Sequence, residues 1–279
     1  MRFIKIFYCS AVLWLLSTPV SKAQNQIPLV IKPTPDISIS LLASSNKVSI
    51  RGLSVVNDNV FWASGSGGMV AKTTDGGKNI EWMQVPGFEK RDFRDIEAFD
   101  QNTAIIMAIA SPAIILKTMD GGKSWKKVFE DTSAAMFLDA MHFEKVDGKL
   151  VVMVVGDPIN QKIFYDKTFE GGDSWIKPSK KELKYVPTVP AGEAMFASSG
   201  TNIAITNFSK ESPWLVVTGG TKSRLKDFLN HSFNDSLPLL QGFSSAGANS
   251  IAFNNAIQKG LTFIQNNQFR NGFCSICQK

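Results

Sequence analysis

The chain has 279 residues, of which 44% are hydrophobic and 19% are charged, and this composition excludes a disordered or collagen-like chain. Three cysteines are too few for a disulfide-rich scaffold, and two histidines argue against a histidine-based metal site. The net charge of +6 comes from scattered lysines rather than from a basic stripe with interleaved aromatic residues, so we expect no nucleic-acid partner.

The chain begins like a secretory signal peptide. Arg2 and Lys5 precede an apolar stretch at 6–16, and small residues at Ser21 and Ala23 occupy both positions that determine cleavage. The stretch is about half the roughly 20 residues that a membrane-spanning helix needs. We therefore expect cleavage after Ala23, export to the periplasm or the cell exterior, and no stable membrane span.

One short motif occurs three times after this segment, beginning at Thr73, Thr118 and Thr168. The clearest copy reads Thr-x-Asp-x-Gly-x-Ser-Trp. Its structural positions in the three copies are Asp75 and Gly77; Asp120, Gly122 and Trp125; and Glu170, Gly172 and Trp175. Asp accepts hydrogen bonds from the backbone just ahead of it and glycine supplies positive φ, so each copy predicts a hairpin turn. A calcium loop would need several alternating carboxylates, and we expect no metal.

Short apolar and β-branched segments surround each motif and predict units of four antiparallel strands. We expect strands at 48–56, 60–64, 69–73 and 81–85; at 93–99, 103–110, 114–118 and 125–129; at 137–143, 150–156, 162–167 and 175–177; and, in a degenerate unit, at 193–198, 203–206, 214–218, 222–228 and 236–240. A fifth unit opens at 248–253, and 258–264 adds one more strand at best. Such repeats predict an all-β fold, a β-propeller of about five to six four-stranded blades with the last incomplete. A β-sandwich is the alternative, but it gives no reason for a repeated turn.

The predicted organisation has four parts. Residues 1–23 are the signal peptide, 24–47 an N-terminal segment in which 37–43 could supply a ring-closing strand, 48–257 the propeller blades, and 258–279 an atypical C-terminal tail. The tail contains a CxxC pair, Cys274 and Cys277, without the helix start of a redox motif or the two further ligands of a zinc site. We assign this pair no role.

The repeated motif resembles the Asp-box, or bacterial neuraminidase repeat. The wider pattern, over about 40–256, resembles exported propellers related to the photosystem II stability and assembly factor family. The stretches that carry this resemblance are Ile50-Arg51-Gly52-Leu53, Phe93-Arg94-Asp95-Ile96, Leu138-Asp139-Ala140-Met141, Gly156-Asp157-Pro158, Ala191-Gly192-Glu193-Ala194 and Gly219-Gly220-Thr221-Lys222-Ser223-Arg224. Relative to this family, we expect the C-terminal end to be truncated or altered. Some relatives are labelled oxidoreductases, but 65–68 is a hairpin turn rather than a phosphate-binding loop, so we expect no cofactor.

The functional surface of a propeller is usually the mouth of its central channel, which the first strand of each blade lines. Polar residues at equivalent positions of these strands are Arg51, Arg94, Asp139 and Glu193, with Asp95 beside Arg94; Asp157, Arg224 and Asn249 could join the rim. Two interpretations stay open. The arginines and acidic residues could form a pocket for an anionic or glycan ligand, or they could form salt bridges that tie blades together.

The sequence thus predicts a monomeric, exported binding or assembly-factor-like protein that presents a polar channel mouth to a protein or glycan ligand. The alternative is a glycoside hydrolase, in which Asp139 and Glu193 are the weak candidates for a catalytic carboxylate pair. A sialidase-like enzyme would also need three convergent arginines and a tyrosine nucleophile. Arg51, Arg94 and Arg224 could supply the arginines, but Tyr165 and Tyr185 fall outside the channel strands. We lean toward a non-enzymatic role.

Overall fold

The computed structural model describes residues 38–44, 47–186, 188–198, 200–205, 214–227, 234–254, 259–264 and 273–276. The predicted signal peptide and Cys277 lie outside the described residues. The chain divides into two compact units, Met1–Ser40 and Leu41–Lys279. In the first unit the described residues 38–40 are exposed and form no strand, and all the described strands belong to the second unit.

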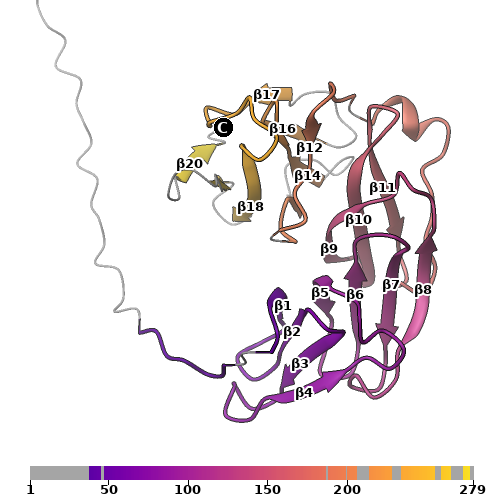
Figure 1. The fold of residues 1–279 in the computed structure, drawn as a ribbon, viewed down its shortest axis with the longest axis vertical. Coiled ribbons are helices and arrows are strands. Elements are labelled where there is room, and N and C mark those ends of the chain that lie inside the picture. Colours follow the sequence, from indigo (N-terminus) through magenta and orange to yellow (C-terminus); the bar gives the residue numbers. More distant parts are fainter. Residues whose placement is uncertain are drawn as a thin grey trace, which may run out of the picture. The chain divides into compact units, whose positions relative to one another are not determined.

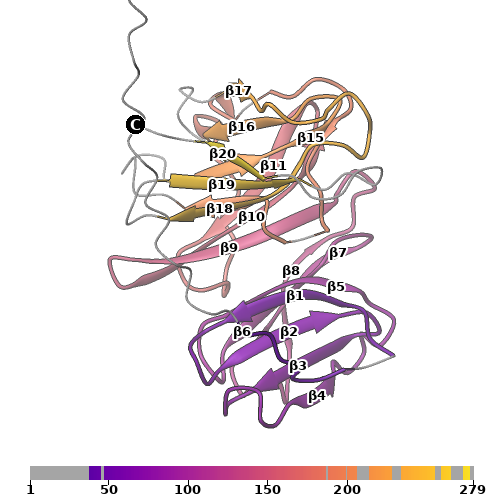
Figure 2. The ribbon, with the colours of Figure 1, turned by 90° about the vertical axis from the view of Figure 1, so that its left-hand side faces the viewer.

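Two four-stranded antiparallel sheets follow each other at the start of the second unit. The first contains β1 (Ile50–Val55), β2 (Phe61–Gly65), β3 (Met69–Thr73) and β4 (Glu81–Gln84). The second contains β5 (Phe93–Ala98), β6 (Ala104–Ala108), β7 (Ala113–Thr118) and β8 (Lys126–Asp131). The strands of each sheet lie side by side in chain order, as Figure 2 shows for β1 to β4. The eight predicted strands of this region are confirmed, with bounds that differ by at most two residues at either end.

The third sheet differs from the prediction. It contains β9 (Leu138–Val146), β10 (Lys149–Ile159) and β11 (Lys162–Thr168). The strand expected at 175–177 is reduced to a single bridge between Lys167 and Ile176. A short 3-10 helix, η1 (Glu182–Lys184), follows in a stretch that the sequence predicted to contain no regular element.

The remaining sheets are shorter. A two-stranded sheet joins β12 (Glu193–Ala194) to β15 (Gly219–Gly220), so the strand expected over 193–198 ends after two residues. Next to these in the chain are β13 (Ile203–Ile205), β14 (Trp214–Val217), β16 (Arg224–Asp227) and β17 (Asn234–Ser236), and then β18 (Ala248–Asn254), β19 (Lys259–Ile264) and β20 (Phe273–Ile276). The prediction of at most one strand in the C-terminal tail was wrong, because β20 pairs antiparallel with β19.

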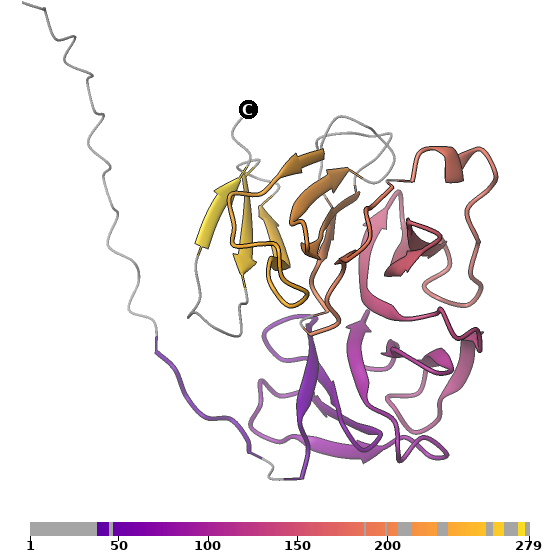
Figure 3. The same cartoon turned by 45° about the horizontal axis from the view of Figure 1, so that its top comes forward.

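Successive sheets are packed through their first strands. β1 lies against β5, β5 against β9, β9 against β13, and β13 against β18. Figures 1 and 3 show that the sheets follow one another in chain order, with β1, β5 and β9 toward a common central region and β4 and β8 on the outside. Residues 41–44 are exposed and form no strand. The ring-closing strand and the number of blades stay predictions.

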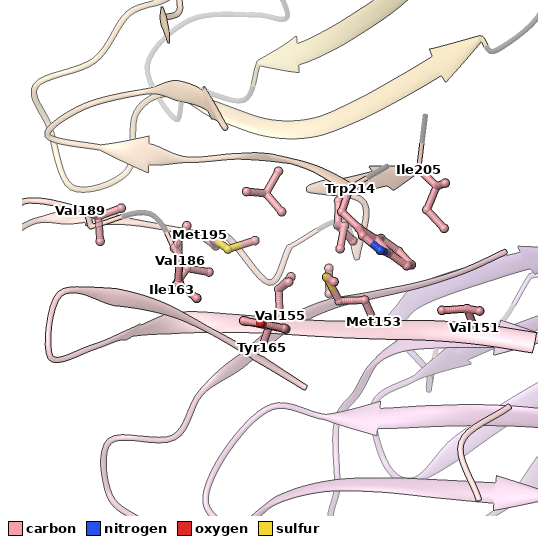
Figure 4. Close-up of a cluster of buried hydrophobic side chains, with 13 residues drawn as sticks. Val151, Met153, Val155, Ile163, Tyr165, Val186, Val189, Met195, Ile205 and Trp214 are labelled. Carbon is pink, nitrogen blue, oxygen red and sulfur yellow. The ribbon is translucent and has the colours of Figure 1, made fainter. Parts of the chain in front are cut away.

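The hydrophobic core lies between the sheets rather than inside one of them. All five residues of β6 are buried, and its neighbouring residues Ile105 and Ile106 belong to clusters on opposite faces of the sheet. A third cluster separates the β9–β11 sheet from β13 and β14, where Trp214 lies opposite Met153 (Figure 4). Because the central strands are covered on both faces, they read in the sequence as apolar runs instead of strict alternation.

The three repeated motifs lie in turns after β3, β7 and β11. In the second copy, Thr118 Oγ1 donates to Asp120 Oδ1 and accepts from Gly122 N, both at 2.9 Å. Asp120 also accepts from the Ser124 backbone N at 2.9 Å and from Ser124 Oγ at 2.6 Å, and these bonds lower the pKa of Asp120 to about 2. Gly122 has φ of 90°, and a Cβ there would meet Met83 Sδ at 2.9 Å. This position therefore requires glycine for both conformation and space.

The same bonds recur in the first copy and are weaker in the third. Gly77 N donates to Thr73 Oγ1 at 3.0 Å, whereas the bond from Gly172 N to Thr168 Oγ1 is 3.3 Å long. Glu170 still receives Ser174 Oγ at 2.7 Å, because its longer side chain reaches the same donor. The Glu copy is followed by the single bridge at Ile176 instead of a strand.

We predict that Thr118→Val destabilises the protein by about 1–3 kcal/mol, because valine leaves the buried Gly122 N–H without an acceptor. The free energy of unfolding from urea titration measures this effect. Thr132→Val is the matched control at an exposed position, with an expected change within about 0.5 kcal/mol. Equal effects of the two substitutions would show that the turn bonds do not stabilise the fold.

Candidate functional site

Four first strands carry the same backbone irregularity. The pairing register skips one residue between Ile50 and Gly52 in β1, and the same happens in β5, β9 and β18. The skipped residues are Arg51, Arg94, Asp139 and Asn249. A β-bulge of this kind re-aims the side chain of the extra residue. These four polar residues therefore occupy equivalent places in four sheets.

A pocket of about 470 Å³ lies where several of these sheets meet. Its lining comes from β5, β10, β12 and β18 and from the loops beside them. The lining residues are Arg94, Phe137, Asp157, Ala194, Met195, Phe196, Ala197, Ser198, Ser245 and Asn249. Apolar side chains thus form much of the wall, with a few polar groups among them, which is the usual composition of a ligand site. Two of the four bulge residues, Arg94 and Asn249, lie in this lining.

Arg51 and Arg94 share one acidic partner. Arg94 Nε donates to Asp92 Oδ2 at 2.8 Å, and Arg51 Nε lies 3.6 Å from Asp92 Oδ1. Asp92 directly precedes β5, so this group links the first sheet to the second. Arg51 is outside the pocket lining and fits the interpretation as a salt bridge between sheets, whereas Arg94 takes part in both the bridge and the pocket.

Asp157 and Asp139 form a carboxyl pair at the pocket. Asp157 lines it and accepts a hydrogen bond from the Met195 backbone N–H, while its buried Oδ1 has no hydrogen-bond partner. Asp139 is 0% exposed, and neither of its oxygens has a hydrogen-bond partner. Burial raises the pKa of Asp139 well above its usual range, and the charge of Asp157 raises it further. Burial also raises the pKa of Asp157.

Asp95 lies in a different environment from its neighbour Arg94. It is buried, and its Oδ2 accepts from the Met141 backbone N at 2.6 Å while Oδ1 accepts from Ile96 N at 2.8 Å. Burial and the nearby Glu97 raise the pKa of Asp95. Its carboxyl group ties β5 to β9 and is absent from the pocket lining.

Glu193 and Arg224 form a buried ion pair. The Glu193 side chain is 0% exposed, and Arg224 Nε lies 3.0 Å from each of its oxygens while Arg224 Nη2 donates a further bond. Thr218 Oγ1 donates to Glu193 at 2.7 Å, and Lys226 Nζ lies 4.0 Å from Oε1. Burial lowers the pKa of Lys226 to about 8. This cluster connects β12 to β14 and β16 and supplies no side chain to the pocket lining.

The sequence-predicted residues thus separate into three groups. Arg94, Asp157 and Asn249 line the pocket with Asp139 next to Asp157, Arg51 and Asp95 link sheets, and Glu193 with Arg224 forms the buried pair. The weak catalytic candidates Asp139 and Glu193 are both buried and belong to separate clusters. Tyr165 is buried and Tyr185 is exposed, and neither is in the lining.

Sequence reasoning missed the apolar part of the pocket. Phe137, Met195 and Phe196 lie directly before or after first strands, and Ser198 and Ser245 lie in adjacent loops. The search for polar residues at equivalent positions ignored them. The signal that could have found Phe137 and Phe196 is an aromatic residue within the predicted first strands 137–143 and 193–198.

The described part of the chain contains no candidate metal site and no candidate membrane-spanning helix. Within those ranges, no three side chains of His, Cys, Asp or Glu come together in a way that could hold a metal ion. A search of the same residues for a helix with the length and apolar character of a membrane span finds none.

Comparison with solved structures supports an assignment of the fold. No protein-family model and no curated protein matches the sequence. Among solved structures, the chain is similar to an ancestral GH74 enzyme, with a TM-score of 0.51 and 15% identity over 81% of this chain and 32% of that one. That enzyme is a β-propeller. The fold of this chain is a β-propeller.

Two further structures are similar at lower scores. YCF48 bound to D1 peptide has a TM-score of 0.48 and 14% identity over 81% of this chain and 79% of that one. The GH74 enzyme of Niastella koreensis has a TM-score of 0.48 and 13% identity over 77% and 33%. The chain thus spans about a third of the length of the two GH74 enzymes. At these identities the likeness concerns the fold alone.

Proposed function

We propose that this propeller is a binding protein that receives side chains of a protein ligand in the pocket at the bulges of its first strands. The observation that carries the proposal is the lining itself. Phe137 and Phe196 supply aromatic surface, while Asp157, Arg94 and Asn249 supply hydrogen-bonding groups at fixed positions. Aromatic anchors beside a few oriented polar groups are typical of the centre of a binding interface.

The glycoside hydrolase alternative has less support. Hydrolysis of a glycosidic bond needs two carboxyl groups that flank the bond. Within the described part of the chain, Asp157 is the single carboxyl group of the pocket lining, because Asp139 and Glu193 are buried. A glycan bound without hydrolysis remains an outcome of the test below.

The proposal includes the finer expectations from the sequence. Residues 1–23 direct export, the three repeated turns are Asp-boxes, and 48–257 form five to six blades of a monomeric, assembly-factor-like protein. The hydrogen bonds of Thr118, Asp120 and Ser124 support the second of these expectations. The similarity in fold to propellers supports the blade architecture.

Selection of peptides from a random display library, followed by calorimetry on the synthesised peptides, tests the proposal. We predict that Phe196→Ala lowers the affinity of the protein for the selected peptides at least tenfold. This is the size of effect expected when an aromatic anchor is truncated. Phe169→Ala is the matched control, because Phe169 is 42% exposed and lies outside the lining. The proposal fails if both substitutions lower the peptide affinity equally. It also fails if no peptide binds and the protein instead binds glycans on an array or hydrolyses fluorogenic glycosides.

A further inference from the structure

The carboxyl pair at the pocket lacks a cation. Asp157 Oδ1 is buried in the wall without a hydrogen-bond partner, and both oxygens of Asp139 are in the same condition. Buried polar groups are nearly always hydrogen-bonded, and the exceptions call for an explanation such as a missing ligand. Asp139 makes no side-chain bond between sheets of the kind that Asp95 makes with Met141. Asp157 does accept such a bond from the Met195 backbone N–H, but its Oδ1 still has no partner.

Asp139 adjoins the pocket without lining it, and Arg51 at the equivalent bulge of β1 is outside the lining as well. Asp139 occupies the bulge position of β9, and the residues at this position in β5 and β18, Arg94 and Asn249, both line the pocket. Its charged neighbour is Asp157, which is itself in the lining. Asp139 is therefore a fully buried neighbour of the lining residue Asp157.

Other buried acids of the structure have compensating groups. Glu193 has Arg224 and Thr218, and Asp166, which also lacks hydrogen-bond partners, has the charge of Lys177 nearby. Among the described residues of the lining, Arg94 is the single cation, and its Nε donates to Asp92. Two adjacent carboxyl groups without a positive charge are costly to bury.

The remaining walls suit a long side chain that ends in a cation. Phe137, Met195 and Phe196 are apolar, and methylene stems of lysine and arginine cover such surface while the charged head reaches a polar partner. Aromatic faces also attract cations. A volume of about 470 Å³ leaves room for such a side chain together with its neighbours in a peptide.

We propose that this pocket selects ligands with a lysine or arginine side chain, whose cationic head binds Asp157 beside its buried neighbour Asp139. The inference rests on the proposed function, because it names the chemistry of the group that the same pocket receives. Binding would give the carboxyl pair the positive partner that it lacks.

The test is calorimetry on the full protein with three small probes that differ only in one side chain. N-acetyl-lysine methylamide should bind at least tenfold more tightly than N-acetyl-norleucine methylamide and N-acetyl-glutamate methylamide. Asp157→Asn should remove this preference, whereas Asp147→Asn should retain it. Asp147 is a matched control, because it is an exposed aspartate at the turn between the same two strands, β9 and β10.

The possible results separate this inference from the proposed function. Equal binding of the lysine and norleucine probes, or a lysine preference that survives Asp157→Asn, overturns the cationic inference. If selected peptides still depend on Phe196 in that case, the pocket remains a binding site with different chemistry. If neither probes nor peptides depend on any lining residue, both the inference and the proposed function are wrong.

Discussion

Arg224→Ala should lower the free energy of unfolding by about 3–5 kcal/mol, the usual cost of removing one partner from a buried ion pair. The loss is large because the Glu193 side chain is 0% exposed and would lose the three hydrogen bonds from Arg224 without access to water. Lys226 lies 4.0 Å from Glu193 Oε1, too far for the hydrogen bonds that Arg224 makes, so it replaces only part of the interaction. Urea titration at neutral pH measures the change.

The control for this prediction is a partly exposed ion pair of the same type. Arg51 and Asp92 are 35% and 32% exposed, and Arg51→Ala should cost at most about 1 kcal/mol. The double substitution Arg224→Met with Glu193→Met should recover most of the stability, because it removes both charges. Losses of similar size for Arg224→Ala and Arg51→Ala would contradict the assignment of Glu193 as a buried, compensated carboxylate.

Asp139→Asn should change how stability depends on pH. Because the folded-state pKa of Asp139 is raised, the folded protein holds a proton that the unfolded chain loses above a pKa of about 3.9. The wild-type protein therefore loses stability as the pH rises from 4 toward the folded-state pKa, at about 1.4 kcal/mol per pH unit. Asparagine has no charge to bury, so the variant should lose less stability than the wild type between pH 4 and 7, with a shallower slope over that range.

Asp147→Asn provides the comparison for this pH profile. Asp147 is exposed, and its replacement should leave the slope of stability against pH unchanged. Unfolding of the three proteins by urea at pH 4, 5, 6 and 7 gives the slopes. If Asp139→Asn follows the wild-type slope, the carboxyl group of Asp139 is ionised in the folded protein and its burial has no energetic cost.

Much of the fold could be predicted because each of the first three units carries a local sequence motif that specifies its turn. The Thr-x-Asp-x-Gly motif specifies hydrogen bonds within a few residues, as Thr118, Asp120 and Gly122 show, and it marks where paired strands begin and end. The predictions failed where that local signal weakens. The strand expected at 175–177 follows the Glu170 copy of the motif, and β20 follows no copy at all. Its pairing with β19 depends on contacts distant in sequence, which no local pattern reveals.

The site was less predictable because a bulge disturbs the alternation of side chains. One extra residue in a strand reverses which residues face the neighbouring sheet, so the surroundings of Asp139 and Asp95 could not be read from spacing. The sequence identified Arg94, Asp157 and Asn249, which do lie together in the pocket lining. It also grouped Glu193 with them, although the next residue, Ala194, is the one in the lining, and Glu193 binds Arg224 of a different sheet.

The most direct measurement of the central claim is hydrogen–deuterium exchange of the full protein with and without a saturating selected peptide. Binding in the pocket predicts slower exchange in the segments that form it, namely 93–95, 137, 157, 194–198 and 245–249. Exchange in the outer strands β4 and β8 should remain unchanged. Protection confined to the outer strands, with no change in the pocket segments, would contradict the claim that this pocket is the binding site.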